Sequence, residues 1–150
     1  MKRHKSLIEL SRQHHDALIL AQLIKKGAPV YRDMPTDTEG KRKYTIHMYE
    51  NDLTKHFEIE EQIVIPSVRG YRSEIDDLCN EIIEDHKKIK NYVELLSENK
   101  DAEKNLDELG FLIESHVRKE EGNLFNKIQD ELSETELDEI ELSINNFMKK

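Results

Sequence analysis

Four histidines occupy positions where amphipathic stripes at helical spacing would otherwise carry hydrophobic residues. They are His14, His56, His86 and His116. Two of them are followed four residues later by a glutamate, in the pairs His56–Glu60 and His116–Glu120. Residues at this spacing lie about 40° apart around a helix, so both side chains project from the same face. Because neutral imidazoles and ionised carboxylates bind divalent cations, the pattern predicts a metal site.

Burying these six side chains inside a helical bundle is energetically unfavourable unless a ligand binds them. A buried polar group that lacks a partner costs roughly 1–3 kcal/mol, and an unpaired charge costs more. Carboxylates and histidines on facing helices form paired-metal sites in bundles. At about 1.5 Å per residue, each histidine falls near mid-bundle, so antiparallel helices bring all four to a common height. A metal-free interaction bundle with a buried polar layer is the alternative.

The first helix offers two adjacent histidines, His14 and His15. The face through His14 carries an apolar series of Leu7, Leu10, Ala17, Ala21 and Ile24. The face through His15 mixes apolar and polar residues: Ile8, Ser11, Leu18, Gln22 and Lys25. The first face is the cleaner hydrophobic stripe, so we select His14 as the ligand. His15 is interpreted as a boundary residue or as support for a ligand.

Four further titratable residues are expected outside the site. They are His4, His47, Glu61 and Glu121. The two glutamates lie five residues after His56 and His116, about 140° around the helix, and are interpreted as solvated charge. His47 is half a turn out of phase with the inward stripe and is expected to be exposed. His4 lies in a terminal segment that is expected to fray.

Helix start and stop signals place five helices along the chain. The first begins at the capping box of residues 6–9 and stops at Gly27 and Pro29, and a long connection covers residues 27–40. The second spans about residues 41–69, with Pro66 expected to kink or end it. The third begins at Ser73, and the fourth spans about residues 101–129. A second capping box at residues 133–136 begins a short fifth helix.

No strand pattern competes with these helices, so the predicted fold class is all-α. Four long amphipathic helices, with short loops after the second and third of them, predict an antiparallel up-down four-helix bundle. Its core covers about residues 6–130, and the C-terminal helix at about 133–148 is expected to pack across one open side. A length of 150 residues fits a single domain, residues 1–150.

Composition excludes several classes of function. The chain has 23 Lys and Arg against 32 Asp and Glu, a net charge of −9, which argues against nucleic-acid binding. No apolar run approaches the roughly 18 residues that span a bilayer, so no membrane partner is expected. The basic first residues lack the features of a signal peptide. The single cysteine, Cys79, cannot form an internal disulfide, and we expect a cytoplasmic protein.

The histidine motifs resemble those of the hemerythrin-like, or HHE cation-binding, family over about residues 6–130. The matching segments are Gln13-His14-His15-Asp16, residues 56–61, Asp85-His86 and residues 116–125. The resemblance implies a non-haem di-iron site in a four-helix bundle. His14 and His56 would serve one iron, and His86 and His116 the other. Glu60 and Glu120 would bridge the irons together with an oxygen-derived ligand.

One position departs from the pattern of hemerythrins proper. These proteins carry a further histidine four residues after the one that matches His86, where this chain has Lys90. The departure removes a protein ligand from the second iron and favours an exogenous ligand there, which leaves reversible oxygen carriage in doubt. Alternatively, Lys90 points outward and the site uses fewer nitrogens, as in hemerythrin-like domains that lack this histidine.

Two functions remain open. The leading hypothesis is a di-iron protein that binds or reduces a small ligand such as oxygen, peroxide or nitric oxide. The alternative is a sensing or iron-handling module without catalytic turnover. Zinc and manganese also accept these ligand types. No additional acid–base residue stands out, so the sequence leaves enzymatic activity open, and it names no protein partner.

Overall fold

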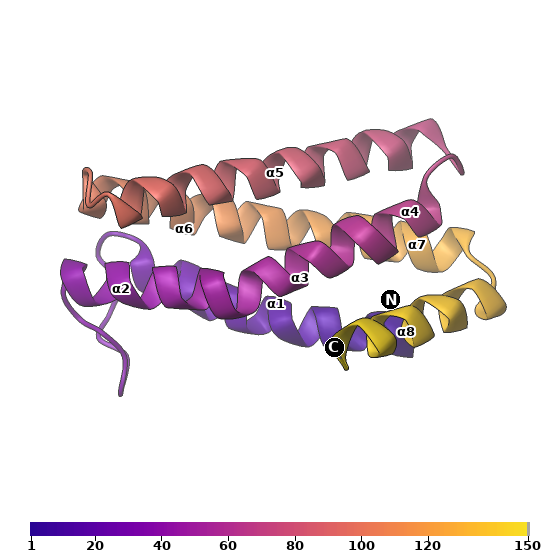
Figure 1. The fold of residues 1–150 in the computed structure, drawn as a ribbon, viewed down its shortest axis with the longest axis horizontal. Helices are drawn as coiled ribbons and strands as arrows, with labels where there is room; N and C mark the ends of the chain where they lie inside the picture. Colours follow the sequence, from indigo (N-terminus) through magenta and orange to yellow (C-terminus); the bar gives the residue numbers. More distant parts are fainter. Residues whose placement is uncertain (150) are drawn as a thin grey trace.

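The computed structural model describes residues 1–149, which are helical without a strand. They form five helical rods (Figure 1). The first rod is α1 (Lys5–Ile24), the third is α5 (Ser73–Ser97) and the fifth is α8 (Glu134–Met148). The second rod joins α2 (Thr38–Met48), η1 (Tyr49–Leu53), α3 (Thr54–Ile59), η2 (Glu60–Val64) and α4 (Ile65–Val68). The fourth joins α6 (Ala102–Lys119), η3 (Glu120–Leu124) and α7 (Phe125–Glu131). The all-helical prediction is therefore confirmed for these residues.

Successive rods run back and forth along the long axis of the molecule, with their connections at alternate ends (Figure 1). The fifth rod, α8, lies beside the N-terminal half of α1. Its buried side chains Leu137, Ile140 and Ile144 join the same hydrophobic cluster as Leu7 and Leu10 of α1. Within the described residues, no helix combines the length and the hydrophobicity needed to cross a bilayer.

At the helix ends, one predicted cap is confirmed and two predictions need correction. At the fifth rod, the predicted capping box between Ser133 and Glu136 is present. At α1, however, the predicted cap by Ser6 is wrong, because His4 Nδ1 accepts the backbone N–H of Ser6 and Ser6 itself is buried inside the helix. His4 is also not frayed: its Nε2 lies 2.7 Å from a carboxylate oxygen of Glu134 in α8.

Three π-helical turns interrupt the second and fourth rods. In η1, η2 and η3, backbone N–H groups of Thr54, Ile65 and Phe125 donate to the carbonyls five residues earlier. The η2 turn lies directly before Pro66, a residue that cannot donate a backbone hydrogen bond. The rod continues past this proline and ends at Val68, in agreement with the predicted end near residue 69. Such turns are rare and occur frequently at functional sites.

The hydrophobic core consists of two clusters that lie on either side of the histidine level. One cluster contains Leu10 of α1 and Ile82 of α5, and the other contains Ala17 of α1 and Ile89 of α5. Each of the first four rods thus passes from one apolar cluster to the other through a short polar interval. The buried groups in that interval are held between two bodies of packed side chains, which limits their movement.

Gly110 permits the close approach of α6 to α1. A Cβ atom at this position would lie 2.8 Å from the carbonyl oxygen of Ala21 and 2.9 Å from Cγ of Lys25. We predict that Gly110→Ala lowers the free energy of unfolding by about 1–3 kcal/mol, because the two helices must separate to admit the methyl group. Urea unfolding measures the change. Gly122→Ala, where a Cβ would meet nothing within 4 Å, is the control and should cause no loss; equal losses in both variants would contradict this explanation.

Candidate metal centre

The six residues selected from the sequence come together in the middle of the molecule. All are buried, with exposed fractions from 0% for Glu120 to 5% for His86. They form two sets of possible metal ligands that share both glutamates: His14, His56, Glu60 and Glu120 in one, and Glu60, His86, His116 and Glu120 in the other. Within each set, one ligand atom from every residue lies within 4.8 Å of the others.

Each histidine is fixed from behind by a hydrogen bond at Nδ1. The pairs are Gln13–His56 (2.7 Å), Glu61–His86 (2.7 Å), Asp85–His116 (3.0 Å) and Glu121–His14 (2.7 Å). The first rod supports the histidine of the second, the second that of the third and the third that of the fourth, and the fourth returns to the first. A partner that accepts from Nδ1–H leaves the lone pair on Nε2 and fixes the ring orientation, as at metal-ligating histidines.

His14 and His56 face each other through Nε2 atoms only 3.0 Å apart. With both Nδ1 atoms donating outward, these two Nε2 atoms are acceptors that repel each other unless a proton or a cation lies between them. Zn–N bonds are about 2.0–2.1 Å long, so two nitrogens bound to one ion at right angles are about 3 Å apart. The observed separation therefore matches two ligands of one ion.

The carboxylate of Glu60 faces both histidine sets. Its Oε2 lies 3.4 Å from Nε2 of His56 and 3.8 Å from Nε2 of His14. Its Oε1 lies 3.1 Å from Nε2 of His86. Glu120 is placed in a similar way, because its Oε1 lies 3.7 Å from Nε2 of His14 and 2.5 Å from Nε2 of His116. Both glutamates can therefore connect ions in the two sets.

Four buried atoms at the centre lack a hydrogen-bond partner. They are Oε2 of Glu60, both carboxylate oxygens of Glu120 and Nε2 of His116. His116 Nε2 and Glu120 Oε1 are close, but their orientation does not form a hydrogen bond. Leaving a buried carboxylate unpaired is strongly unfavourable. A cation at this position would satisfy all four atoms, so the donor set fits a metal centre.

The π-helical turns place pairs of consecutive glutamates around histidines of neighbouring rods. Glu60 is the first residue of η2, and Glu60 and Glu61 contact the two nitrogens of His86 at 3.1 and 2.7 Å. Glu120 is the first residue of η3, and together with Glu121 it brackets His14 in the same way. Glu61 is exposed, as expected, and Glu121 is partly buried, but both also hydrogen-bond to a histidine of a neighbouring rod, which the interpretation as solvated charge alone missed. The repeated Glu-Glu sequence was the signal that could have identified them.

The remaining candidates lie away from the centre. His15 and His47 are exposed, and Lys90 is exposed on α5. His14 is the member of the adjacent pair that is buried, at 3% exposure.

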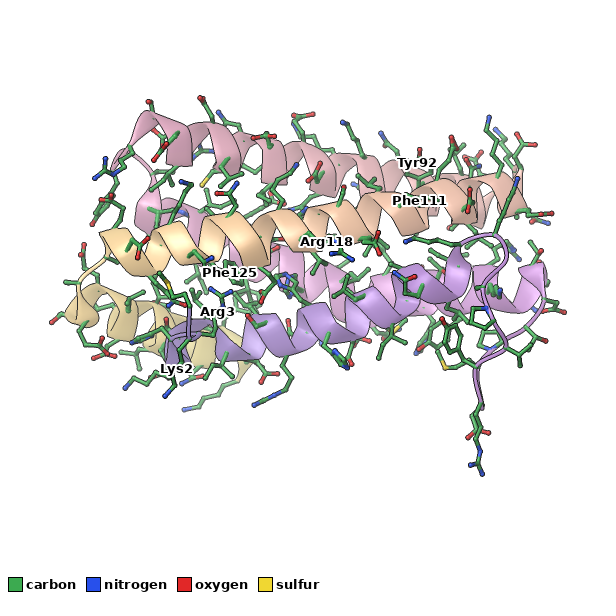
Figure 2. The ribbon with its side chains drawn as sticks, turned by 180° about the vertical axis from the view of Figure 1, so that it is seen from behind. Lys2, Arg3, Tyr92, Phe111, Arg118 and Phe125 are labelled. Atoms are coloured by element: carbon green, nitrogen blue, oxygen red, sulfur yellow. The ribbon has the colours of Figure 1, made fainter. Side chains whose placement is uncertain are left out.

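Phe125 stacks on His14 with ring centroids 5.4 Å apart, and the guanidinium of Arg3 covers the Phe125 ring. Figure 2 shows Arg3 and Phe125 next to each other, near the N-terminal end of α1.

Burial and hydrogen bonds compete in setting the pKa values of the metal-free centre. Burial lowers the pKa of His14, but hydrogen bonds to Glu121 and Glu60 outweigh it and raise this pKa to about 8. Burial raises the pKa of Glu60, but charge interaction and hydrogen bonds with the surrounding histidines hold it well below its usual range. Burial lowers the pKa of His116 despite its hydrogen bond to Asp85. In the metal-free centre, protonation of His14 thus supplies part of the positive charge that a metal cation would provide.

A small apolar cavity of about 10 Å³ adjoins the centre and touches His14, His56 and His116. Its remaining walls are Gln13, Ala17, Leu53, Phe57, Ile89, Ile113 and Val117. The volume is near the minimum of roughly 10–15 Å³ that holds one water molecule, and hydrophobic walls offer water few hydrogen-bond partners. A small ligand of low polarity therefore suits this cavity.

The sequence matches the hemerythrin HHE cation-binding domain over residues 3–128. The chain belongs to this family. No curated protein and no solved structure gives a significant match to the chain. Family membership makes a metal-binding module the expected role of the buried histidines and glutamates, and the two ligand sets fit this role. The matched region ends at residue 128, so the fifth rod, α8, lies outside the part of the chain that matches the hemerythrin HHE domain.

Removing the partner of a histidine should weaken metal binding without removing a ligand. We predict that Glu61→Gln and Glu121→Gln each reduce metal affinity by about 10–100-fold, because an amide supports the imidazole less well than a carboxylate. Titration with zinc against a competing chelator measures the affinity. Glu139→Gln, which changes an exposed glutamate of α8, is the matched control. Unchanged affinity in both variants would contradict the role assigned to these pairs.

The raised pKa of His14 predicts the pH dependence of the metal-free protein. A raised pKa stabilises the fold fully below the unfolded-state value of about 6.5, and this stability is lost as pH rises through about 8. The shift corresponds to about 2 kcal/mol. Urea unfolding of chelator-treated protein at pH 6 and pH 9 measures the change. His14→Gln should reduce the pH dependence by this amount, and an identical profile in this variant would refute the assignment.

Proposed function

We propose that the chain binds two metal ions at the centre of an antiparallel four-helix bundle. His14 and His56 hold one ion, His86 and His116 hold the other, and Glu60 and Glu120 bridge them. The observation that carries this proposal is the group of buried, unpaired atoms on Glu60, Glu120 and His116. The division into two ligand sets with shared glutamates supports a dinuclear site over a single ion.

We propose iron as the metal. Mixed imidazole and carboxylate ligation suits iron, while zinc and manganese are the competing candidates. Bound iron would supply redox chemistry and an open coordination position for a small exogenous ligand. The chain's own contribution is to orient four imidazoles through Nδ1, to supply two buried carboxylates and to exclude water with an apolar cavity.

The ligand we propose is small, such as oxygen, peroxide or nitric oxide. The described residues around the cavity include no acid or base beyond the ligands themselves. This lining favours binding of the ligand over its chemical conversion. It therefore gives specific support to the second candidate function, a sensing or iron-handling module without turnover. In that case metal occupancy controls folding or partner binding, because binding to the folded state alone stabilises it. The free, buried Cys79 fits a reducing compartment, and we propose the cytoplasm.

Metal content is the decisive measurement. Protein purified from iron-supplemented cells should contain two irons per chain, and its ultraviolet–visible spectrum should shift on addition of azide. His56→Ala and Glu60→Gln should lose at least one iron per chain, because each removes a ligand. His47→Ala changes an exposed histidine and should retain both.

Three outcomes separate the candidate functions from each other and from the metal-free alternative. Sustained peroxide turnover that His56→Ala abolishes would support catalysis. A large fall in melting temperature on chelation, with no ligand chemistry, would support the sensing or iron-handling module. Wild-type protein without iron, manganese or zinc would overturn the proposal.

A further inference from the structure

A groove of about 480 Å³ lies outside the metal centre, between α1, the segment from η1 to α3, and the end of α8. Its inner wall includes Gln13, Ala17, Leu53 and His56, and its outer rim includes Phe147 and Met148 of α8. The two rim residues come from the rod that lies outside the matched family domain. The groove therefore combines residues at the centre with a C-terminal element that lies outside the matched family domain.

The groove and the small apolar cavity share a wall. Gln13, Ala17, Leu53 and His56 line both spaces, so these four residues separate the groove from the inner face of the centre. Gln13 and His56 are held by a hydrogen bond to each other, and Ala17 has no side-chain rotamers. Leu53 is the member of this wall that can change rotamer without breaking a hydrogen bond.

Leu53 is also well placed to move. It is the last residue of η1, the widened turn in which the Thr54 N–H donates to the Tyr49 carbonyl five residues earlier. Its exposed fraction of 7% is among the highest of the buried hydrophobic residues, because it reaches the groove. Rotamer changes of exposed side chains take ps–ns. Leu53 is buried but borders the groove, so a change of its rotamer would open the wall between the groove and the cavity.

The charges of the groove indicate which ligand can use it. Asp16, Asp52 and Glu58 line it against a single cation, Lys55. This negative balance disfavours anions at the mouth, and the apolar cavity behind Leu53 disfavours charged or strongly hydrated species. An uncharged diatomic molecule meets neither barrier.

We infer that an uncharged diatomic ligand reaches the centre from this groove by passing Leu53, and that the end of α8 restricts the mouth. This inference rests on the proposed function, since it requires a ligand-binding centre behind the wall. It assigns access control to residues that bind no metal. A second groove, beside His86 and Lys90, is the competing route.

Nitric oxide association with the anaerobic iron-loaded protein tests the route by stopped-flow absorbance. We expect Leu53→Ala to raise the association rate constant and Leu53→Phe to lower it, each by about tenfold, a change within the range seen among variants of one site. Leu20→Ala removes the same atoms from the same hydrophobic cluster but lines neither space, so its rate should be unchanged. Iron content should stay at the wild-type value in all three variants.

The mouth is tested by variants that leave the core intact. Met148→Trp should slow nitric oxide association, because the larger side chain fills the rim. Leu142→Trp, at an exposed position of α8 outside the groove, should leave it unchanged. Equal rates for wild type, Leu53→Ala and Leu53→Phe would overturn the inference and favour the groove beside Lys90. Equal acceleration by Leu53→Ala and Leu20→Ala would also overturn it, because general loosening would then explain the effect.

A measurement without metal distinguishes failure of the route from failure of the proposed function. Dissolved oxygen is paramagnetic and broadens the methyl resonances that it contacts. In metal-free protein, the methyl groups of Ile89 and Ile113 should be broadened in wild type and protected in Leu53→Phe. Loss of iron binding with this pattern intact would refute the proposed function alone. Iron binding with no difference between the two proteins would refute the route alone.

Discussion

The structure depends on a layer of buried imidazoles and carboxylates that protein hydrogen bonds alone cannot satisfy. Glu60 and Glu120 are almost completely buried, and three of their four carboxylate oxygens lack a hydrogen-bond partner. The layer separates the hydrophobic core into two clusters, and each of the first four rods crosses it near mid-length. Without a cation, its stability must come from partial protonation, which is why hydrogen-bonded His14 has a raised pKa. Binding and folding are therefore coupled at this layer.

A closed series of hydrogen bonds converts four separate helices into one ligand frame. Each rod supplies the partner for the histidine of the next, and Glu121 returns from the fourth rod to His14 of the first. Two of the partners are tied further outward, because Glu121 accepts from Ser11 and Asp85 accepts from Lys119. Movement of any one rod thus disturbs a histidine on its neighbour. Such a frame preorganises the ligands and reduces the cost of metal binding.

The sequence predicted the rods and the convergence of six residues because both follow helical periodicity. It could not predict the role of Glu61 and Glu121, although their angle from His56 and His116 was correctly expected to be large. The interpretation overlooked that a side chain directed away from the histidine of its own helix can still hydrogen-bond to a neighbouring rod. The π-helical turns were also beyond reach, since periodicity assumes regular α-helix. The cap of α1 depended on a contact with Glu134, far along the chain.

The two ligand sets are alike, and Lys90, which lies one turn after His86 on α5, is exposed. Each set has two histidines and shares the same two glutamates, so the number of protein ligands does not distinguish the two positions. Their surroundings do. Phe57 stacks on His86 with ring centroids 3.9 Å apart, whereas the apolar cavity adjoins His14 and His56 together with His116. Any chemical difference between the two ligand sets must therefore arise from packing and access, since the donor residues are matched.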